Sequence, residues 1–137
     1  MTKKEYLSQA FYLDRKIKAK ERQLEAIRCH AEYSSPKTDG EFIKSRSVQS
    51  ALEESAVKII ELENYVSNQI KELVRLKAEI EQVIKSVGNI EYETVLEMRY
   101  LSFMDWKEIS ARMEYGGKYV FRVHGRALEL IRLPSNY

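Results

Sequence analysis

DWKEISARM (residues 105–113), EYGG (114–117) and KYVFRVHGRALELIR (118–132) follow one another in this chain without a spacer. The first part has the apolar spacing of a short helix, the second is a glycine turn, and the third has the pattern of a basic amphipathic helix. Two helices joined by so short a turn are typical of a helix-turn-helix. The stretch therefore predicts that motif, and with it a duplex DNA partner.

The first helix of this motif has a well-marked start. Asp105 and Glu108 are spaced as a capping box, in which each side chain accepts a hydrogen bond from the other residue's backbone N–H. Met104 and Ile109 are placed as the matching hydrophobic staple. We expect the second helix to begin near Gly117, with Gly116 where a polar cap would be usual.

The second helix has distinct apolar and polar faces. Its predicted inward residues are Val120, Val123, Ala127, Leu130 and Ile131, and its predicted outward residues include Lys118, Arg122, Gly125, Arg126 and Glu129, flanked by Tyr119 and Phe121. A major groove admits one helix and offers acceptors on guanine and on phosphates. Arg122 is placed to contact a base edge, and Gly125 lacks a side chain where the helix would approach the DNA backbone. The candidate DNA-binding residues are Gly117, Lys118, Tyr119, Phe121, Arg122, Gly125 and Arg126.

Charge is distributed unevenly along the chain. The formal net charge is only +2, but residues 112–137 hold five Lys/Arg against two Asp/Glu. Residues 89–111 hold two Lys/Arg against five Asp/Glu. A local basic face is a better indication of nucleic-acid binding than the overall charge. Arg122 and Arg126 taken singly are as well explained as solvated surface charges.

A further helix is predicted just before the motif. Gly88 can take the left-handed conformation that ends a preceding helix, and Asn89 can cap the next one. The apolar side of that helix is Val95, Leu96, Met98 and Leu101. Trp106 is expected to anchor the core beside the staple rather than to stack on a ligand.

The N-terminal part predicts two long helices joined by a loop. The first covers about 4–31, with Lys20 interrupting an apolar stripe, and the loop covers about 32–47. The second covers about 48–87 and would span about 60 Å, so it needs a partner along its length. That partner is either the first helix, folded back antiparallel, or a second subunit. In the second helix, an apolar residue recurs every seven positions, at Ile59, Val66, Leu73, Ile80 and Val87.

Several function classes are disfavoured by composition and motifs. We see no apolar run long enough to span a membrane and no signal region, so no membrane partner is expected. Cys29 is the only cysteine, which excludes an intrachain disulfide and favours a reducing cytosol. His30 and His124 have no ligand cluster around them. We therefore expect no metal, no cofactor, no catalytic residues and no enzymatic activity.

Residues 92–130 resemble region 4 of bacterial sigma-70 factors. The matching pieces are VLEMRYL (95–101), WKEIS (106–110), VFRV (120–123) and RAL (126–128). With its helical N-terminal half, the whole chain is similar to the small phage and prophage regulators of the ArpU/RinA type from Gram-positive hosts. That resemblance implies late-gene transcription as the function, and DNA contacts at Gly117, Lys118, Phe121 and Arg122. Because glycine and phenylalanine stand at contact positions that are usually polar, Phe121 either contacts a thymine methyl group or packs on the N-terminal half.

Together these observations predict an all-α protein. Residues 1–88 would form a long antiparallel, coiled-coil-like helical hairpin, and residues 89–137 a sigma-region-4-like helix-turn-helix. The expected function is transcription regulation at promoter or operator DNA. Host RNA polymerase is a further expected partner, and residues 48–87 offer a surface for a homodimer. The alternatives are a small terminase-like DNA-packaging subunit and a helical protein–protein interaction module that binds no DNA.

Overall fold

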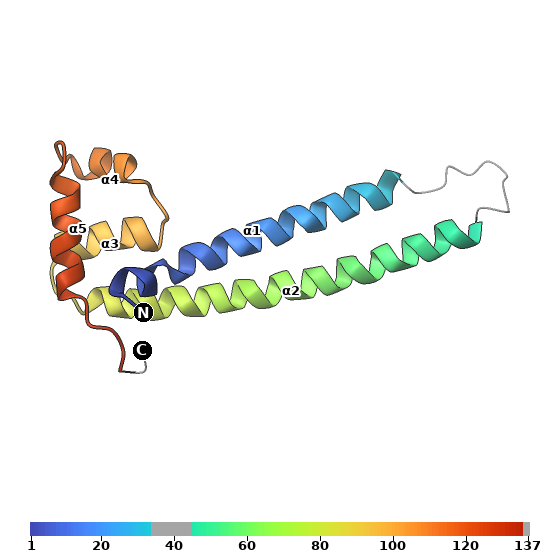
Figure 1. Ribbon diagram of the computed structural model, residues 1–137, viewed down its shortest axis with the longest axis horizontal. Helices are drawn as coiled ribbons and strands as arrows, with labels where there is room; N and C mark the ends of the chain where they lie inside the picture. The colour runs from blue at the N-terminus through green and yellow to red at the C-terminus, as the bar shows by residue number, and fades with distance from the viewer. Residues whose placement is uncertain (34–44, 136–137) are drawn as a thin grey trace. The chain divides into compact units, whose positions relative to one another are not determined.

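Every regular element is a helix in the computed structural model, which describes residues 1–33 and 45–135 (Figure 1). The prediction of an all-α protein is therefore confirmed for these residues. No described helix is both long and apolar enough to cross a membrane. The helices are α1 (Lys3–Tyr33), α2 (Ser45–Lys85), α3 (Ile90–Tyr100), α4 (Trp106–Met113) and α5 (Tyr119–Leu130).

The two long helices differ slightly from their predicted bounds. Most of the predicted loop over 32–47 falls on residues 34–44, which lie outside the described residues, and its two edges are helical. Helix α2 ends at Lys85, two residues before the predicted end. There the Ser86 hydroxyl donates to the Val83 carbonyl (2.5 Å), and Gly88 takes the predicted left-handed conformation with φ +74°. The helix therefore ends at Lys85, before Val87, the last residue of the predicted heptad pattern.

The chain divides into two compact units that differ from the predicted division at residue 88. Unit 1 contains Met1–Asp14 and Glu72–Tyr137, and unit 2 contains Arg15–Lys71. The first turns of α1 and the last turns of α2 thus belong to the same unit as α3, α4 and α5. Each unit has its own buried side chains, so each is described by itself.

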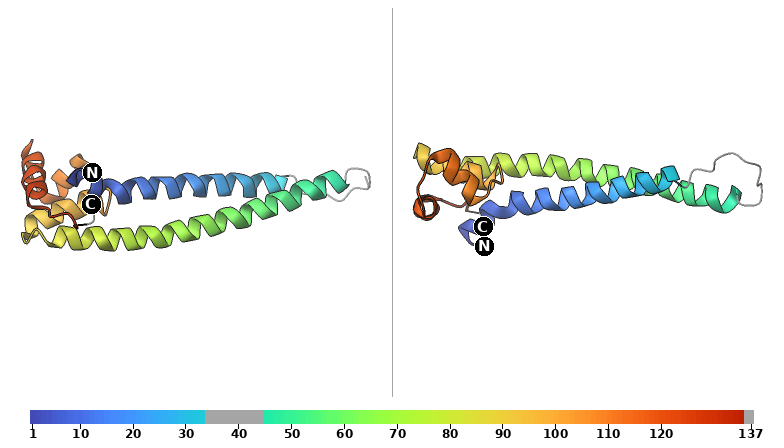
Figure 2. Two further views of the ribbon diagram at one scale, coloured as in Figure 1. Left: turned by 60° about the horizontal axis from the view of Figure 1, so that its bottom comes forward. Right: turned by 90° about the horizontal axis from the view of Figure 1, so that it is seen from above.

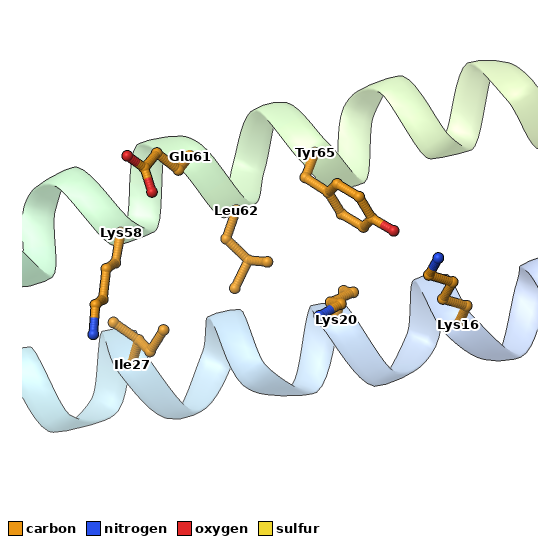
Figure 3. Close-up of a pocket in the computed structure, with 7 residues that line it drawn as sticks. All are labelled: Lys16, Lys20, Ile27, Lys58, Glu61, Leu62 and Tyr65. Atoms are coloured by element: carbon orange, nitrogen blue, oxygen red, sulfur yellow. The ribbon is translucent and has the colours of Figure 1, made fainter.

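Unit 2 is a pair of helical segments that run in opposite directions (Figure 2). Ile17 and Leu24 of α1 and Val66 of α2 are buried, and Arg28 forms an ion pair with Glu63. The seam opens at Lys20, the residue that interrupts the predicted apolar stripe. Here a groove of about 550 Å³ is lined in part by Lys16, Lys20, Leu62 and Tyr65 (Figure 3). Both lysine ammonium groups lie within 6 Å of the Tyr65 ring centroid, at 5.9 and 5.8 Å.

The main core of unit 1 includes the beginning of the chain. Tyr6, Leu7 and Ala10 of α1 are fully buried, and the Tyr6 hydroxyl donates to the Glu79 carboxylate at 3.1 Å. The predicted stripe began at Ala10, so Tyr6 and Leu7 were missed. The other buried members of this cluster are Leu76, Ile80, Val83, Ile84, Leu96, Tyr100, Ala127 and Ile131.

A second buried cluster joins the three short helices. Val95 of α3, Ile109 of α4, and Val120 and Val123 of α5 are all at most 2% exposed. Burial of side chains of this size contributes about 1.5–3 kcal/mol each relative to the exposed side chain. This cluster therefore fixes α4 and α5 against α3, where the three lie next to one another in Figure 1.

Candidate nucleic-acid interface

Both predicted helix caps are present at the starts of α3 and α4. The Asn89 side chain accepts a hydrogen bond from the Tyr92 backbone N–H at 3.1 Å. The Asp105 carboxylate accepts one from the Glu108 backbone N–H at 2.7 Å. Each bond satisfies a donor that would otherwise have no partner in the first turn of a helix.

The capping box at α4 is only half formed. The Glu108 carboxylate accepts a hydrogen bond from the Arg112 guanidinium one turn later (3.3 Å). In the described residues, the Asp105 backbone N–H donates no hydrogen bond to that carboxylate. The reciprocal half of the box was therefore predicted wrongly, because a cation at i+4 competes for the same carboxylate. Both staple residues belong to one apolar cluster, since Met104 packs against the cluster in which Ile109 is buried.

The turn between α4 and α5 is built from two left-handed residues. Glu114 caps α4 with φ +56°, and Gly117 has φ +54°. A hydrogen bond from the Tyr115 hydroxyl to the Glu91 carboxylate (2.7 Å) ties this turn to the start of α3. Burial, together with this bond, raises the pKa of the Tyr115 phenol above its ordinary value.

Helix α5 begins at Tyr119, two residues later than predicted. A residue with the φ angle of Gly117 cannot belong to a right-handed helix, so Lys118 becomes the first flanking residue. No side chain caps this start, because Gly116, Gly117 and Lys118 carry no acceptor group. Of the predicted contact residues, Gly117 thus lies in the turn and Lys118 at the helix boundary.

The predicted inward face of α5 is confirmed except at Leu130, the last residue of the helix. Val120, Val123 and Ala127 are buried as predicted, but Leu130 is 47% exposed. The helix ends at Leu130, and the next residue, Ile131, is extended and buried in the main core of unit 1. Leu130 is still helical, so its exposure means that the buried face of α5 ends at Ala127.

All the predicted contact residues are exposed in unit 1. At about 100° per residue, Lys118, Arg122 and Gly125 lie along the centre of the outward surface of α5. Tyr119 and Arg126 lie on one flank, and Phe121 lies on the other. We call this surface, made by Lys118, Tyr119, Phe121, Arg122, Gly125 and Arg126, the α5 outer face.

The cations of the α5 outer face differ from the arginines of α3 and α4. Arg112 of α4 pairs with Glu108, and Arg99 of α3 donates to the Met104 carbonyl (3.0 Å). By contrast, Lys118, Arg122 and Arg126 form no ion pair with a carboxylate of the described chain. These three cations stand against one exposed carboxylate, Glu129, on the outward side of α5, so this side has a net positive charge that attracts anions.

One arginine and two aromatic side chains form a cluster beneath the α5 outer face. The Arg99 guanidinium carbon lies 4.5 Å from the Trp106 ring centroid, within the range of a cation–π interaction. The Trp106 ring lies 5.5 Å from that of Phe121 and 4.6 Å from that of His124. Half-buried Trp106 packs against the second buried cluster, as expected for an anchor. We name Arg99, Trp106 and His124 the support cluster.

His124 is the functional feature that the sequence analysis missed. It was weighed only as a metal ligand, yet it is buried on α5 with its Nε2 atom 2.6 Å from the Tyr100 hydroxyl. Burial, with a smaller contribution from nearby Lys4 and Arg99, lowers the pKa of His124 to about 4. Its place between Val123 and Ala127 on a helix with 3.6-residue periodicity was the available signal.

Comparison with known proteins gives one positive result. No curated protein and no solved structure matches the chain. A family model described as "Protein of unknown function (DUF1492)" matches residues 32–131, which include all of α2, α3, α4 and α5. Because this match covers well over half of the sequence, the chain belongs to the DUF1492 family.

Proposed function

We propose that this protein is a phage-type transcription regulator that binds promoter or operator DNA through α5. In this proposal, α4 and α5 are the two helices of a sigma-region-4-like helix-turn-helix, and α3 is the supporting third helix. Late phage genes are the proposed targets and the bacterial cytoplasm the proposed location. Host RNA polymerase is the proposed protein partner.

The single observation that carries the proposal is the unpaired positive charge of the α5 outer face. Lys118, Arg122 and Arg126 project from one helix and have no carboxylate partner in the described chain. Uncompensated cations in this arrangement repel one another, and phosphate oxygens would relieve that repulsion. Arg28 and Arg75, by contrast, are exposed arginines that pair with glutamates.

The geometry of the short helices supports the same proposal. A helix needs an exposed side of its own to enter a major groove about 12 Å wide. The inward residues of α5 are buried against α3 and α4, while its outward residues are exposed from Lys118 to Arg126. The tight turn at Gly117 keeps α4 close to the start of α5, which lets α4 lie across the DNA backbone.

The long helices are assigned to assembly in this proposal. We propose that α1 and α2 form an antiparallel, coiled-coil-like hairpin and that α2 also provides a homodimer surface. Unit 2 supports this role because Val57, Ile60 and Ile70 of α2 are 54%, 57% and 43% exposed. A dimer would bury these apolar side chains and would present two recognition helices to two half-sites.

Binding of duplex DNA over a salt series tests the proposal. Fluorescence anisotropy with labelled duplexes from a random-pool selection should give affinity that falls as the salt concentration rises. The double variant Arg122→Ala/Arg126→Ala should bind more weakly, and the slope of log affinity against log salt should shrink by about 2. If the wild-type protein shows no salt-dependent affinity for any duplex, the proposal fails.

A matched control separates the loss of a DNA contact from a loss of charge. Arg75→Ala also removes one arginine from unit 1, but Arg75 lies on α2 and pairs with Glu72 and Glu79. We expect its salt slope to equal that of the wild type. An equal loss of affinity in Arg75→Ala and Arg122→Ala would indicate a non-specific charge effect and would contradict the assignment of α5.

A further inference from the structure

Phe121 is an exposed aromatic side chain in the first turn of α5. It is 51% exposed, although Trp106 contacts its ring. The sequence left two alternatives for Phe121, namely a contact with DNA and packing on the N-terminal half. In unit 1 it belongs to neither buried cluster, whereas its neighbour Val120 is 1% exposed. Phe121 therefore keeps an apolar surface free for a partner.

The free ring of Phe121 is held in place from one side. Its ring centroid lies 5.5 Å from that of Trp106, at an interplanar angle of 59°. Trp106 is in turn fixed by the Arg99 guanidinium and by the edge contact with His124. A side chain that is already ordered loses little conformational entropy when it binds a partner. The support cluster thus presents Phe121 as a preorganised contact.

The surroundings of Phe121 indicate what that partner is. Lys118 lies one turn before it and Arg122 directly after it, both exposed and without a carboxylate partner in the described residues. A purely apolar protein partner would have to desolvate these cations at considerable cost. Duplex DNA offers phosphates to the cations, and in its major groove the thymine 5-methyl group is the apolar feature.

We propose that Phe121 reads a thymine by contact with its 5-methyl group. This inference rests on the proposed function, because it requires α5 to lie in the major groove. Arg122 would then contact a neighbouring phosphate or base edge on the same strand region, while Phe121 distinguishes thymine from cytosine. The target site of this protein should accordingly contain at least one thymine whose methyl group matters for affinity.

Replacement of thymine by uracil tests this inference directly, because it removes the methyl group and keeps the base pair. Each thymine of a selected duplex is replaced in turn, and affinity is measured for wild type and Phe121→Ala. At one position, uracil should weaken wild-type binding about four-fold, as expected for loss of one buried methyl group. The same replacement should leave the affinity of Phe121→Ala unchanged.

Two further variants keep the test decisive. Leu130→Ala removes an apolar side chain that is 47% exposed on the same helix, and it should retain the full uracil effect. Phe121→Leu keeps an apolar contact and should retain part of the effect even if Phe121→Ala proves unstable. The inference is overturned if DNA binds in a salt-dependent manner but no uracil position affects the wild type more than Phe121→Ala. Absence of any salt-dependent binding overturns the proposed function and this inference together.

Discussion

The hydroxyl of Tyr100 lies 2.6 Å from Nε2 of His124, and both side chains are buried in unit 1. Tyr100 is the last residue of α3 and His124 lies in the middle of α5, so this hydrogen bond joins the two helices. Burial raises the pKa of Tyr100 to about 12 and lowers that of His124 to about 4. The pair is therefore a neutral phenol and a neutral imidazole at pH 7.

This pair predicts that the protein loses stability in mild acid. Because the pKa of His124 is about 4 in the folded state and about 6.5 when unfolded, protons bind preferentially to the unfolded chain. The contribution of neutral His124 is fully present above pH 6.5 and is lost progressively as the pH falls toward 4. We expect the free energy of unfolding to fall by about 2 kcal/mol between pH 7.5 and pH 5.

Urea unfolding at several pH values measures this effect. His124→Gln should show a much smaller change in the free energy of unfolding between pH 7.5 and pH 5. His30→Gln is the matched control, because His30 is exposed on α1, and it should keep the wild-type dependence. Equal stability of the wild-type protein at both pH values would contradict the prediction.

The half-formed capping box at α4 makes a second prediction. Asp105 accepts a hydrogen bond from the Glu108 backbone N–H, so Asp105→Ala should destabilise the protein by about 1 kcal/mol. Among the described residues the side chain of Glu108 pairs only with exposed Arg112, so Glu108→Ala should cost about 0.5 kcal/mol or less. Thermal unfolding of both variants measures the difference, and equal losses would mean that the box is complete in solution.

The beginning of the chain makes a third prediction, because it completes the core of unit 1. Leu7 is fully buried with Ile80, Leu96 and Ile131, so Leu7→Ala should destabilise the protein by about 2–5 kcal/mol. Tyr12→Ala is the matched control on the same helix, since Tyr12 is 68% exposed. We expect it to change the free energy of unfolding by about 0.5 kcal/mol or less. A neutral Leu7→Ala would show that residues 1–14 do not belong to this core.

Local features of the fold were predictable from the sequence, and tertiary features were not. The caps at Asn89 and Asp105 and the turn at Gly88 depend on residues within one helical turn, and each was predicted. Burial of Tyr6 depends on α2, α3 and α5, which are far away in the sequence. Tyr6 lies four residues before Ala10 and continues the apolar stripe of α1, so the helical period places it on the inward side. That it is fully buried, although it is so near the end of the helix, depends on these distant elements.

The same distinction holds at the candidate site. Exposure of Arg122 and Arg126 follows from the helical period, which needs only the sequence of α5. The support cluster brings together Arg99, Trp106 and His124 from three helices, and the Tyr100–His124 bond depends on how α3 packs on α5. The exposure of Leu130 also depends on tertiary structure, because the helical period places it on the inward side of α5 and the packing of the other elements decides whether it is covered.

Gly125 makes a fourth prediction, in which stability and DNA binding change in opposite directions. It lies on the exposed side of α5, and a Cβ atom built there meets no other atom within 4 Å. The protein itself therefore gives no reason for glycine, which costs a helix about 1 kcal/mol relative to alanine. Gly125→Ala should raise the free energy of unfolding by about that amount.

If the α5 outer face lies against the DNA backbone, the same substitution should weaken DNA binding, because the added methyl group would occupy the space for the sugar–phosphate chain. Anisotropy and urea unfolding of Gly125→Ala measure the two effects on one protein. Ser8→Ala on α1 serves as the control, since it changes a half-buried helical residue outside α4 and α5 and should leave DNA affinity unchanged. A more stable Gly125→Ala with wild-type affinity would place this part of α5 away from the DNA. A loss of both stability and affinity would instead indicate that glycine serves the fold of α5.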